Sequence, residues 1–163
     1  MALQSITALS KITLQEASST VTFSGIPDTY RDLILVCNLF YNSGSDTYSR
    51  FELNGDTTTA NYKGVYMDTY GGGASGGSTN SNLLEYHQSV SSTTPVHATF
   101  QLFDYSATDK HKTAIIRFGA ATTMTGAYAS RWENNAAVGN LKLVGSVANY
   151  LPGSTFALFG RIA

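Results

Sequence analysis

The residues that could carry chemistry are few in this chain and far apart. His87, His97 and His111 each stand alone on a different expected strand or strand edge, whereas protein metal sites need clustered His, Cys, Asp or Glu side chains. Asp104 and Asp109, in "DYSATD", are too sparse for a calcium-binding loop and are typical of turns. We therefore predict no metal site and no bound cofactor.

Nucleophilic and general acid–base chemistry is equally poorly supported. Glycoside hydrolysis needs two facing carboxylates, but Glu52, Glu85 and Glu133 are scattered along the chain. The Gly-x-Ser-x-Gly elbow of serine hydrolases does not occur. The single cysteine, Cys37, lies inside the apolar run "LILVCNLF" and is predicted to be an inert core thiol without a disulfide partner. We predict no catalytic residues and therefore no enzyme.

Composition narrows the classes of partner. The chain has 10 basic and 11 acidic residues and a formal net charge of −1, so we expect no nucleic-acid partner. Charged residues are only 13% of the chain, about half the usual share, so part of the surface is expected to lie against partners. No apolar run reaches the roughly 18 residues of a membrane span and no signal peptide is present, so we expect a soluble product made in a cytoplasm, with no membrane partner.

Apolar and polar residues alternate with period two along most of the chain, and no helical period is evident. This pattern, interrupted by Gly, Asn, Asp, Ser and Pro, is that of about ten short strands. We predict an all-β fold with little or no helix, a two-sheet antiparallel sandwich that is jelly-roll-like. Residues 1–163 are expected to form one domain, with 1–18 as either an N-terminal arm or a first strand. Clear examples of the alternation are "STVTFSG", "TYSRFELNG" and "VHATFQLFDYSA".

Two predicted strands, 33–40 and 155–162, are apolar on both faces. Such a strand is covered on both sides, either within its own domain or by another subunit. A closing strand of this kind would also be an aggregation hazard as an open edge, so we expect it inside a sheet or under a neighbouring copy. The candidate core or oligomer residues are Ile34, Val36, Phe40, Phe156, Leu158 and Phe159.

The stretch "YGGGASGGSTNSN", residues 70–82, is predicted to be a Gly/Ser loop. It lacks the lysine and the following helix of a phosphate-binding loop, so a contact or mobile surface loop is favoured over an inert insertion. Tyrosines near this and other loops suit either a sugar or a protein surface. The candidate contact residues are Tyr70, Gly71, Gly72, Gly73, Ser75, Asn80 and Asn82.

Several motifs occur in an order that resembles a known family. They are "VTFSGIPDTYRDLILV", "FELNGDTTTANY", "DYSATDKHKTAIIRFG", "SRWENNAAVGNLKLVG" and "GSTFALFGRI". Together, from about Thr20 to Ile162, they resemble the small β-rich virion structural proteins and fibre-tip domains of tailed bacteriophages. The chain departs from the family pattern where "FELNGD" replaces F-N-G-D and where "LFGRI" replaces L-Y-G-I. Neither departure removes a group with catalytic meaning.

This resemblance implies a virion structural protein that acts by adhering. The first expectation is a capsid decoration, or cement, protein that forms a homo-oligomer, with three copies implied by the resemblance. Its partners would then be the major capsid protein or fibre and tail proteins. The alternative is a fibre or tail-associated adhesin or adaptor that binds host surface polysaccharide or another virion protein. The motifs start near Thr20 and leave little chain before them for a fibre shaft, which favours the capsid.

Overall fold

The computed structural model describes residues 5–42, 46–70, 73–79, 84–89, 94–120, 124–145 and 148–162, and only the backbone of 46–48, 70, 79 and 84–89. These residues form strands joined by short turns, with one turn of 3₁₀-helix at Thr59–Asn61. The strands are β1 (Ile6–Thr13), β2 (Thr20–Ser24), β3 (Asp32–Leu39), β4 (Asp46–Leu53), β5 (Tyr62–Tyr70), β6 (Gly73–Thr79), β7 (Leu84–Ser89), β8 (Val96–Phe103), β9 (Lys112–Ala120), β10 (Met124–Trp132), β11 (Asn140–Gly145) and β12 (Thr155–Arg161).

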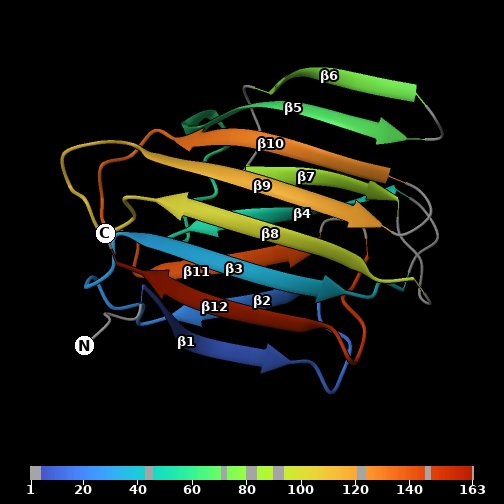
Figure 1. The fold of residues 1–163 in the computed structure, drawn as a ribbon, viewed down its shortest axis with the longest axis horizontal. Helices are drawn as coiled ribbons and strands as arrows, with labels where there is room; N and C mark the ends of the chain where they lie inside the picture. The colour runs from blue at the N-terminus through green and yellow to red at the C-terminus, as the bar shows by residue number, and fades with distance from the viewer. Residues whose placement is uncertain are drawn as a thin grey trace.

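The strands form two antiparallel sheets that pack face to face (Figure 1). The larger sheet has the order β1-β12-β3-β8-β9-β10-β5-β6, and the smaller has the order β2-β11-β4-β7. The chain passes from one sheet to the other at most connections, which gives the jelly-roll-like sandwich predicted from the alternation. The absence of α-helix from the described residues also matches the prediction. None of the described helical turns is long and apolar enough to cross a membrane.

The core lies between the sheets and is built from the inward phase of strands β2, β3, β4, β8, β9, β10, β11 and β12, together with Tyr62 of β5. On β3 the inward residues Leu33, Leu35 and Cys37 are buried, and the rings of Phe51 and Phe100 stack across the core with centroids 4.3 Å apart. Burial raises the pKa of the Cys37 thiol far above its ordinary value. The prediction of an inert core thiol is therefore confirmed.

The closing strand β12 lies inside the larger sheet, between β1 and β3. Phe156 and Leu158 are buried in the core, as expected of two of the six candidate core or oligomer residues. Ile34, Val36 and Phe159 point to the opposite, outward side of the sheet, and Phe40 is half-buried directly after β3. The N-terminal residues Ile6–Thr13 form the outer neighbour of β12 and not a detached arm.

The prediction of a loop over 70–82 is wrong where the structure describes it. β5 continues to Tyr70, and Gly73 and Ser75 lie on β6, an edge strand that pairs with β5 and has exposed side chains. At Gly77 a Cβ would lie 2.9 Å from the Tyr66 hydroxyl oxygen, so a larger residue there would displace the tyrosine side chain. The backbone pairing with β5 places this strand. Its sequence shows no alternation of apolar and polar residues from which it could have been predicted. The candidates Gly71, Gly72, Asn80 and Asn82, and the side chain of Tyr70, lie outside the described residues.

Candidate functional site

Residues from several of the quoted motifs meet at one end of the sandwich, where β4 and β10 end and β5, β9 and β11 begin. The Asp56 carboxylate accepts hydrogen bonds from Trp132 Nε1 at 2.7 Å, from Asn61 Nδ2 at 2.9 Å and from the Thr58 backbone N–H at 2.9 Å. Burial acts to raise the pKa of Asp56, but these hydrogen bonds outweigh it and lower the pKa. We call this set the loop-end network: Asn54, Asp56, Lys112, Trp132 and their hydrogen-bond partners.

Asn54 ties the end of β4 to the segment before β11. Its backbone adopts φ = 52°, a left-handed conformation that asparagine tolerates better than most residues. Its Oδ1 accepts from the backbone N–H groups of Gly139 and Asn140 at 3.0 and 3.1 Å, and its Nδ2 donates to Ala137 O at 2.8 Å. Both polar atoms of the Asn54 side chain therefore form hydrogen bonds within the fold.

Lys112 is a buried cation that binds backbone carbonyls. Its Nζ donates to the carbonyl oxygens of Ala107 at 2.6 Å, Lys110 at 2.9 Å and Asn135 at 3.2 Å. Burial lowers the pKa of this ammonium, partly offset by the carboxylates of Asp109 and Asp104. The side chain joins the loop before β9 to the loop after β10 and presents no group to solvent.

Asp32 is a fully buried carboxylate that is held in the same way. It accepts from Arg31 at 3.0 and 3.2 Å and from the Asp104 backbone N–H at 3.2 Å, and Arg161 lies 3.7 Å away. Burial acts to raise its pKa, and the Arg31 and Asp104 bonds reverse the shift. Among the described residues no three His, Cys, Asp or Glu side chains gather as a metal site would require.

The outward side of the larger sheet has a different character. The strand registers place outward-facing side chains in two rows that cross seven strands. We call these two rows the open face. The first row is Met67, Ala127, Arg117, Thr99, Val36, Ala157 and Lys11, and the second is Val65, Ala129, Ile115, Gln101, Ile34, Phe159 and Ala8.

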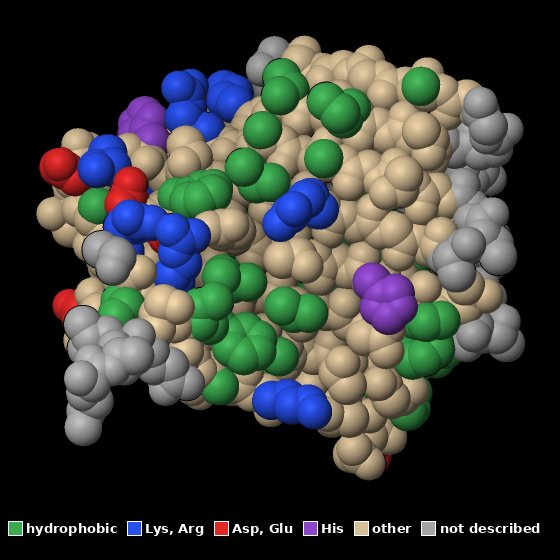
Figure 2. All heavy atoms as spheres, in the orientation of Figure 1, with side chains coloured by type: hydrophobic (Ala, Val, Ile, Leu, Met, Phe, Trp, Pro, Cys, Tyr) green, Lys and Arg blue, Asp and Glu red, His purple; other side chains and the backbone are tan. Residues whose placement is uncertain are grey.

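The open face gathers the exposed apolar surface of the molecule. Met67 is 69% exposed, Val65 56%, Val36 44% and Ile115 42%. With Ile6, which shares the outward phase at the edge of the sheet, they are all of the exposed large hydrophobic residues in the described part of the chain. Figure 2 views this side and shows the hydrophobic side chains spread across it. Single exposed hydrophobic residues are ordinary, but their collection on one face marks an interaction surface.

The charges on the open face are basic. Within the described residues, Arg117 and Lys11 have no ion-pair or hydrogen-bond partner, whereas Arg131 pairs with Glu133 and Arg161 with Asp32. Acidic side chains are seen only toward the margins of this side (Figure 2). Neither row contains an Asp or a Glu, so the face combines aliphatic side chains with unpaired positive charge.

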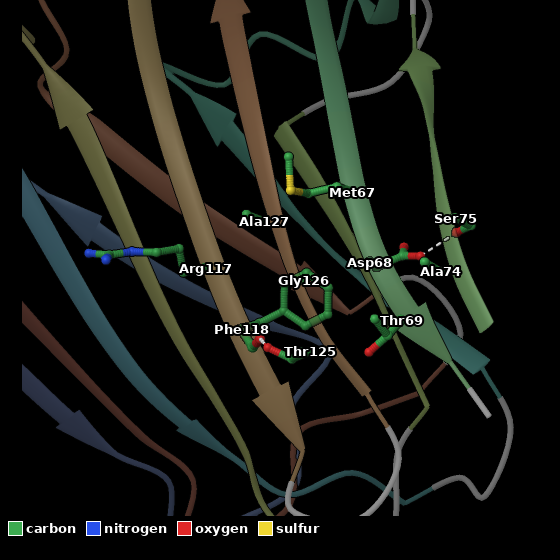
Figure 3. A pocket seen from close by; sticks show the side chains of 10 residues that line it. All are labelled: Met67, Asp68, Thr69, Ala74, Ser75, Arg117, Phe118, Thr125, Gly126 and Ala127. Atoms are coloured by element: carbon green, nitrogen blue, oxygen red, sulfur yellow. Dashed lines mark hydrogen bonds between the residues drawn. The ribbon is translucent and has the colours of Figure 1, made fainter. Parts of the chain in front are cut away.

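Two hollows follow one another along β10, where the outward residues are small. One, of about 450 Å³, surrounds Ala127, and the other, of about 410 Å³, surrounds Ala129. Figure 3 shows Met67 above the first hollow and Arg117 extending away from β10 on the other side of it. Asp68, at its edge, is engaged by the Ser75 hydroxyl (Figure 3). Small side chains on β10 between larger ones on β5 and β9 thus form a groove.

The sequence prediction found one half of the open face and missed the other. The doubly apolar run 33–40 pointed to Ile34 and Val36, but Val65, Met67 and Ile115 were not singled out. The sequence signal that could have revealed Ile115 is "KTAIIRFG", where Ile115 and Ile116 lie on opposite faces of one strand. His97 and His111 are exposed and solitary, and the side chain of His87 lies outside the described residues.

Comparison with known proteins adds little. No protein-family model matches the chain, and no curated protein matches it. Among solved structures, a galectin of Caenorhabditis elegans, LEC-6, is similar over 96% of this chain and 98% of that chain, with 9% sequence identity and a TM-score of 0.35. A likeness of this degree supports no statement about function.

Proposed function

We propose that the protein is a non-catalytic structural component of a tailed-phage particle, a decoration protein that sits on the capsid. The observation that carries this proposal is that four of the five exposed large hydrophobic side chains among the described residues lie on the open face. A face of this kind is suited to docking. The titratable groups of the loop-end network are occupied within the fold, which supports adhesion over catalysis.

The proposal includes assembly as a homo-oligomer, with three copies as the resemblance implies. The polar residues Thr99 and Gln101 on β8 divide the open face into two apolar halves. The half formed by β3, β12 and β1 carries Ile34, Val36 and Phe159, and we assign the contact between copies to it. A monomeric mass in light scattering at micromolar concentration, without the particle, would contradict this assignment.

A fibre or tail position is the alternative role. A sugar-binding adhesin is less well supported than a protein-binding module, because sugar sites use aromatic platforms and the open face is mainly aliphatic. An adaptor that binds another virion protein would use the same face as a decoration protein. The two positions differ in copy number and not in chemistry.

Copy number per particle tests the proposal. Purified particles are separated on a stained gel, and the band of this protein is measured against that of the major capsid protein. Hundreds of copies support the capsid, and a few dozen or fewer support a fibre or the tail. Release of new reducing ends from host capsule or lipopolysaccharide by the purified protein would contradict the non-enzymatic role.

A further inference from the structure

The half of the open face formed by β5, β10 and β9 has features that the other half lacks. Met67 and Val65 are the most exposed large hydrophobic residues in the described chain, and the two hollows along β10 lie beside them. Arg117 borders the first hollow and has no partner within the described residues. We call this half the β10 groove.

The charge of the β10 groove argues against a second copy as its occupant. Lys63, Arg117 and Arg131 line its two hollows, and its acidic neighbours Asp68 and Glu133 are already engaged by Ser75 and Arg131. A second copy applied through its own β10 groove would bring like charges together, Arg117 and Lys63 among them, and such a juxtaposition is unfavourable. A complementary partner supplies carboxylates.

The lining of the groove selects the class of partner. Its apolar side chains are Met67 and Val65 on β5 and Ile115, which pairs with Ala129, on β9. Ala127 and Ala129 form its floor, and Thr69, Thr113 and Thr125 also line its hollows. Aliphatic walls over a small-residue floor receive protruding aliphatic side chains of a protein, since burial of apolar surface drives such contacts. The exposed length, from Thr125 to Arg131, is about 20 Å at the rise of a strand, enough for a short ridge or extended segment.

We propose that the β10 groove docks a protein other than this chain, one that inserts an aliphatic ridge along β10 and presents a carboxylate to Arg117. This inference rests on the proposed function for the setting in which the partner is met, but its chemistry is argued from the groove alone. The guanidinium extends over the face from β9 and away from β10 (Figure 3), where it can pair with a carboxylate beside the ridge. Charge-assisted hydrogen bonding would fix the orientation of the partner.

Site-specific cross-linking tests the inference. The variant Met67→p-benzoylphenylalanine is made in the cells that assemble the particle, irradiated, and its adducts are identified by mass spectrometry. The expected product joins this chain to a different protein at a segment containing aliphatic residues and an Asp or Glu. Adding Arg117→Glu should reduce its yield at least about tenfold, as expected for reversal of one charge in a docked pair. Replacing the partner carboxylate by lysine should restore it.

The matched control is Lys110→Glu, which makes the same charge change at an exposed lysine in the loop before β9, outside the open face. It should leave the yield within about twofold of the parent. An equal loss in both variants would indicate general electrostatic attraction and overturn the role of Arg117.

An adduct between two copies of this chain, or no protein adduct, would overturn the inference. An adduct with a protein that is not part of the particle would support docking in the β10 groove but contradict the proposed function. Circular dichroism of each variant establishes that it has folded.

Discussion

The loop-end network and the open face differ in whether their polar and apolar groups have partners within the fold. At the loop ends, polar groups such as the half-buried Asp56 and the buried Lys112 are matched with partners from other segments, because an unmatched buried polar group is costly. On the open face, apolar side chains such as Met67 remain in solvent and Arg117 is unpaired. The difference indicates that the loop-end network maintains the fold, whereas the open face is the surface that we propose for recognition.

The largest expected effect is at Trp132. The side chain is almost fully buried and also donates to Asp56, so Trp132→Ala should lower the free energy of unfolding by about 3–5 kcal/mol. Trp132→Phe keeps most of the packing and loses only the hydrogen bond, and should cost less. Urea denaturation measures both. If Trp132→Ala lowered the free energy of unfolding by less than about 1 kcal/mol, the loop-end network would not stabilise the fold more than the open face does.

Replacement of Lys112 should have the next largest effect. Lys112→Met keeps most of the unbranched side chain but leaves three carbonyl oxygens without their donor, which should cost about 3 kcal/mol. The control Lys110→Met removes an exposed lysine that only approaches Asp104 at 3.6 Å and should change stability by less than about 0.5 kcal/mol. Thermal unfolding of both proteins in the same buffer makes the comparison. Equal midpoints for the two variants would contradict a holding role for Lys112.

Acid should weaken the loop ends before it affects the open face. The folded-state pKa values of Asp32 and Asp56 are lowered, so their contribution is present above the unfolded value of about 4 and is lost as pH falls through the folded values. Asp56→Asn should cost about 1–2 kcal/mol at pH 7 and reduce the acid dependence. Asp109→Asn, on an exposed turn, is the control. Denaturation midpoints from pH 7 to pH 2 provide the measurement, and an unchanged profile in Asp56→Asn would contradict it.

The smallest expected effect is at Ile115, on the open face. Ile115→Ala should change stability by less than about 0.5 kcal/mol, although it weakens docking in the β10 groove. The matched control is its neighbour Ile116, which points into the core and is fully buried, and Ile116→Ala should cost about 2–5 kcal/mol. Comparable losses at the two positions in urea denaturation of the isolated protein would show that Ile115 is already covered and that the face is not open.

How far the candidate site could be foreseen varies with the strand. The run 33–40 revealed Val36 because both of its phases are apolar, and this can be seen in a single segment. The β10 groove could not be found this way, since its floor consists of alanines and its walls come from β5 and β9. Their proximity depends on strand order and register. The Gly/Ser sequence of β6 misled the prediction for the related reason that it has no apolar phase.

By itself the sequence determined the all-β class and the burial of Cys37 and of the inner phase of β12. These follow from local causes: the period of two in a strand and the burial of apolar phases. Only the tertiary structure decided that Trp132 bonds to Asp56, 76 residues away, and that Met67, Ala127 and Arg117 share one row. Pairing between strands is non-local, and a shift of one residue in register would send each of these side chains to the other face of the sheet.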